Sequence, residues 1–216
     1  FNVMDDAVSD GREALQLAAL DLLCAGSMST IDIPRAGELE KLWKYFNASM
    51  VCTSSIARQQ NIACFVRFLA RIKVSAAATL TRPQDFDAAD HEAVLRCQSW
   101  MQGFCRLCIA CLHPGAVYGK KLMAIELLHA TMEVFEELIS GERPARRKGD
   151  HGVRETCFPI KSAIVGSGLT YGSLRPFPDE LYSASTRDLL YGALADNFDR
   201  IRTVAMSISL MLPPPM

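Results

Sequence analysis

The chain has 216 residues, half of them apolar, and carries 23 basic against 24 acidic side chains, so its formal net charge is −1. Apolar content this high at this length allows a substantial buried core and excludes a wholly disordered chain. The near balance of charge excludes a nucleic-acid or membrane partner selected by bulk charge, so any such preference has to come from local patches.

The sequence contains no run of about 18 uninterrupted apolar residues, and its first residues lack the basic start and apolar stretch of a signal peptide. Most of its eight cysteines fall within apolar helical patterns, where a free cysteine behaves as a small hydrophobic residue. We therefore expect a cytoplasmic protein in a reducing compartment, with no membrane partner.

Apolar residues recur at helical spacing in the first part of the chain, which predicts helices over residues 10–25, 34–49 and 54–78. Gly26 is expected to end the first of these helices. Pro34 suits the first turn of the second, because its ring fixes a helical φ and it needs no hydrogen-bond acceptor there.

The same periodicity predicts helices over residues 87–112 and 118–139, separated by a His-Pro-Gly turn. Residues 141–184 are instead rich in glycine, proline and polar side chains, and they are too many for an ordinary connector. Helices resume at 185–195 and 199–212, and Ser185 followed by Asp188 resembles a capping box.

Successive amphipathic helices without a strand predict helix-on-helix packing, either as one bundle or as stacked pairs. A repeated spacing favours the stacked pairs: Asp6 stands six residues before Arg12, as Asp196 stands six before Arg202. This spacing resembles the inner helix of HEAT and armadillo repeats, in which the aspartate and arginine can pair along the stack.

The predicted fold is therefore all-α, an α-solenoid of HEAT/armadillo-like helical repeats with one long irregular insertion. We divide the chain into helical repeats over residues 1–140, a flexible or irregular insertion rich in basic residues, glycine and proline over 141–184, and a continuation of the same solenoid over 185–216.

Three cysteines at three-residue spacing, Cys105, Cys108 and Cys111, offer soft ligands for zinc or an iron–sulfur cluster. On a continuous helix their side chains fan over roughly 120° of the circumference, whereas a tetrahedral metal needs converging sulfurs. We expect these thiols to pack in the core and predict no metal site.

Two glycine-containing stretches resemble nucleotide loops without matching them. Gly166 and Gly168 follow a short apolar run, but Pro176 and Pro178 interrupt the helix that such a loop requires. The stretch from Gly115 to Lys121 has the wrong glycine spacing for a phosphate loop, and no serine or threonine follows its lysines. We predict no cofactor, no small-molecule substrate and no catalytic residue, so the chain is not expected to be an enzyme.

One local patch is basic. Residues 141–154 contain five basic and two acidic side chains, a net charge of +3. Four of the five basic residues are Arg143, Arg146, Arg147 and Lys148. Such a segment can contact phosphates, or it can simply be a solvated loop, and the sequence leaves both interpretations open.

Several stretches, taken in order, resemble the THADA family, the thyroid adenoma-associated proteins and their fungal and plant relatives. The N-terminal ones are residues 19–24, Ser54 with 58–60, and residues 68–72. The later ones are residues 114–115 with Tyr118, 120–121 and 124–128, and then Leu194, 196–199, 201–202 and Ala205. They cover most of the chain except residues 141–184.

The resemblance implies an internal section of a longer solenoid that is a non-catalytic regulatory subunit. Its expected partners are a tRNA ribose 2′-O-methyltransferase, which would hold the methyl donor, and tRNA, whose anticodon loop it would help to present. The alternative is a protein-only adaptor solenoid with no RNA role.

Residue by residue, the resemblance makes Arg12, Arg58 and Arg202 structural arginines within repeats. Positions 120 and 121 are lysines where arginine is more usual in the family, so bidentate phosphate contact is not expected there. The candidate RNA contacts are Lys120, Lys121, Arg143, Arg146, Arg147 and Lys148.

Overall fold

The computed structural model describes residues 13–25, 32–52, 54–80, 88–140 and 174–213. The described residues form helices and no strand. The predicted all-α class is therefore confirmed. The helices are α2 (Glu13–Ala25), α3 (Ala36–Ser49), α4 (Ser55–Leu80), α5 (Ala88–Ala110), α6 (Tyr118–Val134), α7 (Glu136–Ser140), the 3-10 helix η2 (Asp179–Tyr182), α8 (Ala184–Leu194) and α9 (Asp199–Met211).

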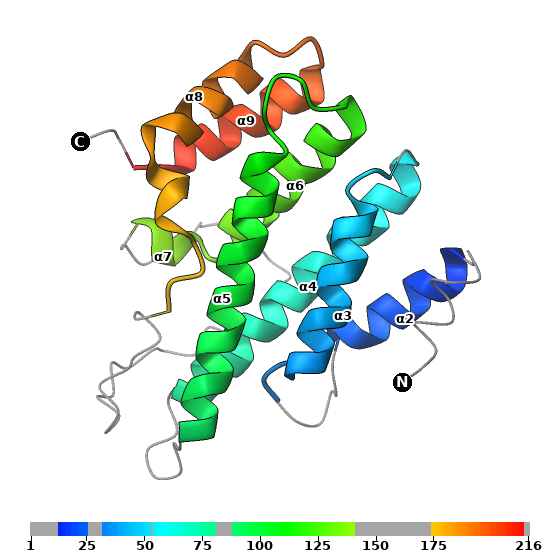
Figure 1. The fold of residues 1–216 in the computed structure, drawn as a ribbon, viewed down its shortest axis with the longest axis vertical. Coiled ribbons are helices and arrows are strands. Elements are labelled where there is room, and N and C mark those ends of the chain that lie inside the picture. Colours follow the sequence, from blue (N-terminus) through cyan, green and yellow to red (C-terminus); the bar gives the residue numbers. More distant parts are fainter. Residues whose placement is uncertain (1–12, 26–31, 53, 81–87, 141–173, 214–216) are drawn as a thin grey trace, which may run out of the picture.

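The helices stack in two layers, with α2 at one end of the molecule and the α8–α9 hairpin at the other (Figure 1). In one layer α2 packs on α4, α4 on α6, and α6 on α9. In the other layer α3 packs on α5, and η2 lies between α5 and α8. Successive helices of each layer thus bury their apolar faces against one another, which is the arrangement of a solenoid.

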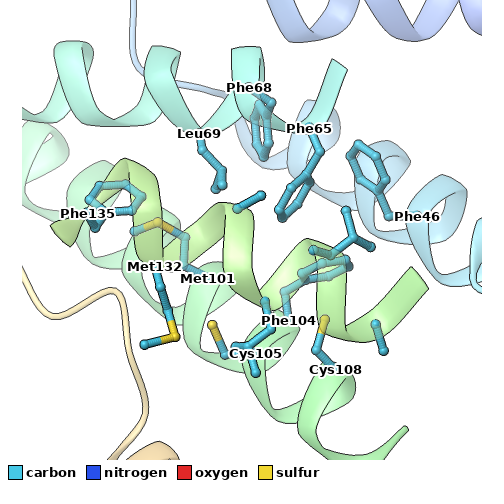
Figure 2. Packing of buried hydrophobic residues seen from close by; sticks show 14 of the residues in the cluster. Phe46, Phe65, Phe68, Leu69, Met101, Phe104, Cys105, Cys108, Met132 and Phe135 are labelled. Atoms are coloured by element: carbon cyan, nitrogen blue, oxygen red, sulfur yellow. The ribbon is translucent and has the colours of Figure 1, made fainter. Parts of the chain in front are cut away.

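An aromatic cluster fills the space where α3, α4 and α5 meet (Figure 2). The Phe46 and Phe65 rings meet edge to face with centroids 4.9 Å apart, and Trp100 stacks on Phe104 at 5.1 Å. The Trp100 indole donates a hydrogen bond to the Leu39 carbonyl at 2.8 Å, so its polar atom is satisfied inside the core. These contacts fix how α3, α4 and α5 pack against one another.

The predicted helix over residues 118–139 is broken at Phe135, whose backbone leaves the helical region at φ −115° and ψ 28°. The Phe135 ring is fully buried and meets Phe177 edge to face, while the Lys73 ammonium donates to the Val134 carbonyl at 2.6 Å. A lysine from α4 thus satisfies a carbonyl at the end of α6. These contacts with other segments of the chain end α6 at a point where the apolar periodicity of the sequence predicts that the helix continues.

The predicted capping box at Ser185 is wrong by two residues. Ser183 is the N-cap of α8: its backbone is extended, and its hydroxyl accepts a hydrogen bond from the Thr186 N–H at 3.2 Å. The 3-10 helix η2 ends just before Ser183, so the chain already has the extended N-cap conformation there.

Of the predicted insertion, residues 141–173 lie outside the described residues, whereas 174–184 pack on α5. Gln98 accepts a hydrogen bond from the Arg175 N–H at 3.0 Å, and Gln102 donates to the Arg175 carbonyl at 2.8 Å. Leu174 and Leu181 of this segment are buried. Among the helices that the structure describes, none combines the length and apolar character needed to cross a bilayer.

Candidate interaction site at the seam between α6 and α9

Two connecting turns lie together at one edge of the solenoid: the α5–α6 turn (residues 111–117) and the α8–α9 turn (residues 195–198). The Gly115 N–H donates to His113 Nδ1 at 3.1 Å, and the Asp196 carboxylate accepts from the Phe198 N–H at 3.2 Å. Each turn is therefore fixed by its own side chains. Helices α6 and α9 pack on each other next to these turns. We call this contact, together with the two turns, the seam.

An ion pair joins the two sides of the seam. The Lys121 ammonium lies 2.8 Å from the Asp196 carboxylate, and each side chain is only 11% exposed. The hydrogen bond from Lys121 holds the pKa of Asp196 below its usual range, helped by the Phe198 N–H. Lys121 was a candidate RNA contact, but the structure commits its ammonium to Asp196 and so to holding α6 against the α8–α9 turn.

Lys120, the residue before Lys121, has a different environment: it is half-buried and lies close enough to Cys111 to affect that thiol electrostatically. Burial raises the pKa of Cys111, and the Lys120 charge opposes this. Of the two candidate RNA contacts in the described part of the chain, Lys120 therefore stays a candidate. The other four, Arg143, Arg146, Arg147 and Lys148, lie outside the described residues.

A second charged contact crosses three helices. Glu126 of α6 is 8% exposed; one of its carboxylate oxygens accepts a hydrogen bond from Arg200 of α9 at 2.7 Å, and the other lies 3.2 Å from Arg58 Nε of α4. Sequence reasoning did not identify Glu126 or Arg200. The available signal was a carboxylate inside the apolar run 122–128, which has to find a cation when the run is buried.

The second copy of the Asp–Arg spacing, Asp196 with Arg202, lies at the α8–α9 turn. Arg202 donates to the backbone carbonyl of Asp196 at 2.7 Å and to the Asp199 carboxylate, while the Asp196 carboxylate turns to Lys121. Lys121 of α6 thus takes the Asp196 carboxylate, and Arg202 contacts Asp196 through its backbone carbonyl. Asp6 and Arg12 lie outside the described residues.

A groove of about 370 Å³ opens between the two turns. Tyr118 and Phe198 line it with ring centroids 3.9 Å apart, and the two residues are 39% and 47% exposed. Asp188, which is exposed, and the half-buried Leu189 of α8 also line the groove. The site thus combines exposed aromatic rings with a carboxylate.

The three cysteines at three-residue spacing are buried within the core, where Figure 2 shows Cys105 and Cys108 among apolar side chains. Burial raises the pKa of Cys105 to about 12 and shifts that of Cys108 in the same direction, so both thiols keep their protons at neutral pH. Within the described part of the chain, no group of three histidine, cysteine or acidic side chains is arranged to hold a metal ion. Gly166 and Gly168 lie outside that part.

Comparison with known proteins identifies the family of the chain. Neither a curated protein nor a solved structure matches the chain significantly. A family model described as "Trm732, TPR repeats" matches residues 2–141, and TPR repeats, like the HEAT and armadillo repeats expected from the sequence, are helical hairpins that stack into a solenoid. Trm732 is the yeast THADA homologue, a non-catalytic regulatory subunit of a tRNA methyltransferase. The resemblance to the THADA family is thereby confirmed, and the chain belongs to the Trm732 family of helical-repeat proteins.

Proposed function

We propose that this chain is a section of a cytoplasmic, non-catalytic scaffold for tRNA 2′-O-ribose methylation in the anticodon loop. The observation that carries the proposal is the family match over residues 2–141. The architecture supports it, because a stack of helical pairs offers extended surfaces on which an enzyme and its RNA can be held together. The partner methyltransferase supplies the methyl donor and the catalytic groups.

In this proposal the RNA is held by basic side chains. Lys120 and the segment with Arg143, Arg146, Arg147 and Lys148 contact phosphates. Binding therefore weakens as salt rises, because the release of counterions from the RNA then gains less free energy. Lys121 supports this surface through its ion pair with Asp196 and not as a free cation.

A binding experiment with matched charge reversals tests the proposal. Purified protein is titrated with tRNA at several salt concentrations in the presence of the methyltransferase. We expect Lys120→Glu to weaken tRNA binding, and joint reversal of the four cations in residues 143–148 to weaken it further. Lys44→Glu is the control, because Lys44 is 73% exposed on α3, away from the seam. Unchanged tRNA affinity in both test variants would contradict an RNA role for these residues.

The alternative is a protein-only adaptor, and one observation favours it: the structure ties Lys121 to Asp196, which leaves fewer cations for RNA. Under this alternative the protein binds the methyltransferase but is indifferent to tRNA at physiological salt. The same titration, run without the methyltransferase and then with it, separates the two functions.

A further inference from the structure

We propose that the groove between the α5–α6 and α8–α9 turns docks a segment of the partner methyltransferase subunit that presents a large apolar side chain with a lysine or arginine beside it. The identity of the partner rests on the proposed function. The chemistry of the docking segment rests on three features of the groove.

The first feature is the exposed apolar surface. Tyr118 and Phe198 line the groove with much of their rings in solvent, and next to Tyr118 in the chain Val117 is 77% exposed. Aromatic side chains are enriched in protein interfaces, and large apolar side chains grouped around one hollow mark an interaction surface.

The second feature is the charge of the lining, which decides between a protein segment and RNA. Lys121 and Asp196 both line the groove and neutralise each other, whereas Asp188 is exposed on the α8 side. The described lining therefore has an unbalanced negative charge. A phosphate would be repelled by Asp188, while a lysine or arginine would be attracted to it.

The third feature is Gly192, which also lines the groove. It lies in the last turn of α8, where glycine is a poorer helix former than alanine, and a Cβ built on it would meet no atom within 4 Å. Packing within the chain therefore does not require a glycine there. The missing side chain leaves this part of the groove open to a segment from outside the chain, because a side chain at this position would occupy the groove.

Blocking the groove tests the proposal. In the purified protein, Gly192→Leu is compared with Gly37→Leu by calorimetric titration with the purified methyltransferase subunit. Gly37 is a matched control, because it is an exposed helical glycine on α3 whose built Cβ also meets nothing within 4 Å. Circular dichroism and thermal unfolding check that both variants are folded.

We expect Gly192→Leu to weaken methyltransferase binding by about tenfold or more, a loss of about 1.4 kcal/mol or more. Asp188→Lys should weaken it by a smaller factor that grows as salt is lowered, because the charge contact is at the surface. Gly37→Leu should bind like the unmodified protein. This pattern would support docking in the groove.

Other outcomes overturn the proposal in distinguishable ways. If the unmodified protein fails to bind the methyltransferase, both the proposed function and the docking site are wrong. If it binds and Gly192→Leu binds equally well, the function stands and the docking site lies elsewhere. If Gly192→Leu weakens binding of tRNA but not of the methyltransferase, the groove is an RNA surface and the protein segment is ruled out.

Discussion

Helix α5 and the seam are both buried, but they bury different chemistry. Around α5 the buried groups are aromatic rings and protonated thiols, with Trp100 and Phe104 stacked and Cys105 and Cys108 beside them. At the seam the charged groups include a buried lysine, a buried glutamate and an aspartate whose side chain is 11% exposed.

The difference shows what each region contributes. Apolar burial is non-directional and tolerates small shifts, so the α5 core supplies stability. A buried ion pair contributes little net stability, yet removing one partner strands the other charge. The seam, through Lys121 and Asp196, therefore fixes which surfaces of α6 and the last hairpin meet.

The largest effect is expected from the α5 core. Phe104→Ala removes a fully buried ring that contacts Phe65 and Trp100, and should lower the free energy of unfolding by about 4 kcal/mol. Urea unfolding measures the loss. Leu210→Ala is the control, because Leu210 is 79% exposed and should change the free energy of unfolding by no more than about 0.5 kcal/mol. A loss below about 1 kcal/mol at position 104 would contradict this view of the core.

The next largest effect is expected at the seam. Asp196→Ala leaves the Lys121 ammonium buried without its partner and should cost about 3 kcal/mol in urea unfolding. Glu92→Ala, which removes an exposed pair with Arg96, should cost no more than about 0.5 kcal/mol. The double variant Lys121→Met with Asp196→Leu should recover most of the loss. If it is as unstable as the single variant, the pair is not the cause.

Acid should weaken the seam before it affects the α5 core. The Lys121 hydrogen bond lowers the folded-state pKa of Asp196 below its unfolded value of about 3.9. Its contribution is therefore fully present above about pH 4 and is lost as the pH falls through the folded pKa. The stability difference between the unmodified protein and Asp196→Asn should shrink below about pH 4. A difference that stays constant from pH 7 to pH 2 would exclude this linkage.

The smallest effect is expected at the groove. Gly192→Ala should raise the free energy of unfolding by up to about 1 kcal/mol, because alanine is the better helix former and its Cβ meets no atom. Gly37→Ala should give a similar gain, measured as a shift in thermal midpoint. If Gly192→Ala is destabilising, the glycine has a role within the fold and the case for outside contact is weakened.

The sequence was sufficient to predict the helices and the solenoid, because apolar periodicity reports which face of each helix is buried. It did not predict the break at Phe135 or the cap at Ser183, because both depend on neighbouring segments that periodicity does not describe. Lys121 is a candidate RNA contact in the sequence because it belongs to the pair of lysines that resembles the basic pair of the THADA family. Its burial depends on Asp196, a residue 75 positions later in the chain.

The segment from Leu174 to Tyr182 fills the layer between α5 and α8, and this affects how the protein folds. An ideal solenoid forms by local contacts that propagate from pair to pair. Here the contacts of Arg175 with Gln102 and Gln98 span 73 and 77 residues, so the α8–α9 hairpin can stack only after a long loop has closed. We therefore expect the hairpin to dock late in folding and to open, in native-state hydrogen exchange, at a lower free energy than the α3–α6 core.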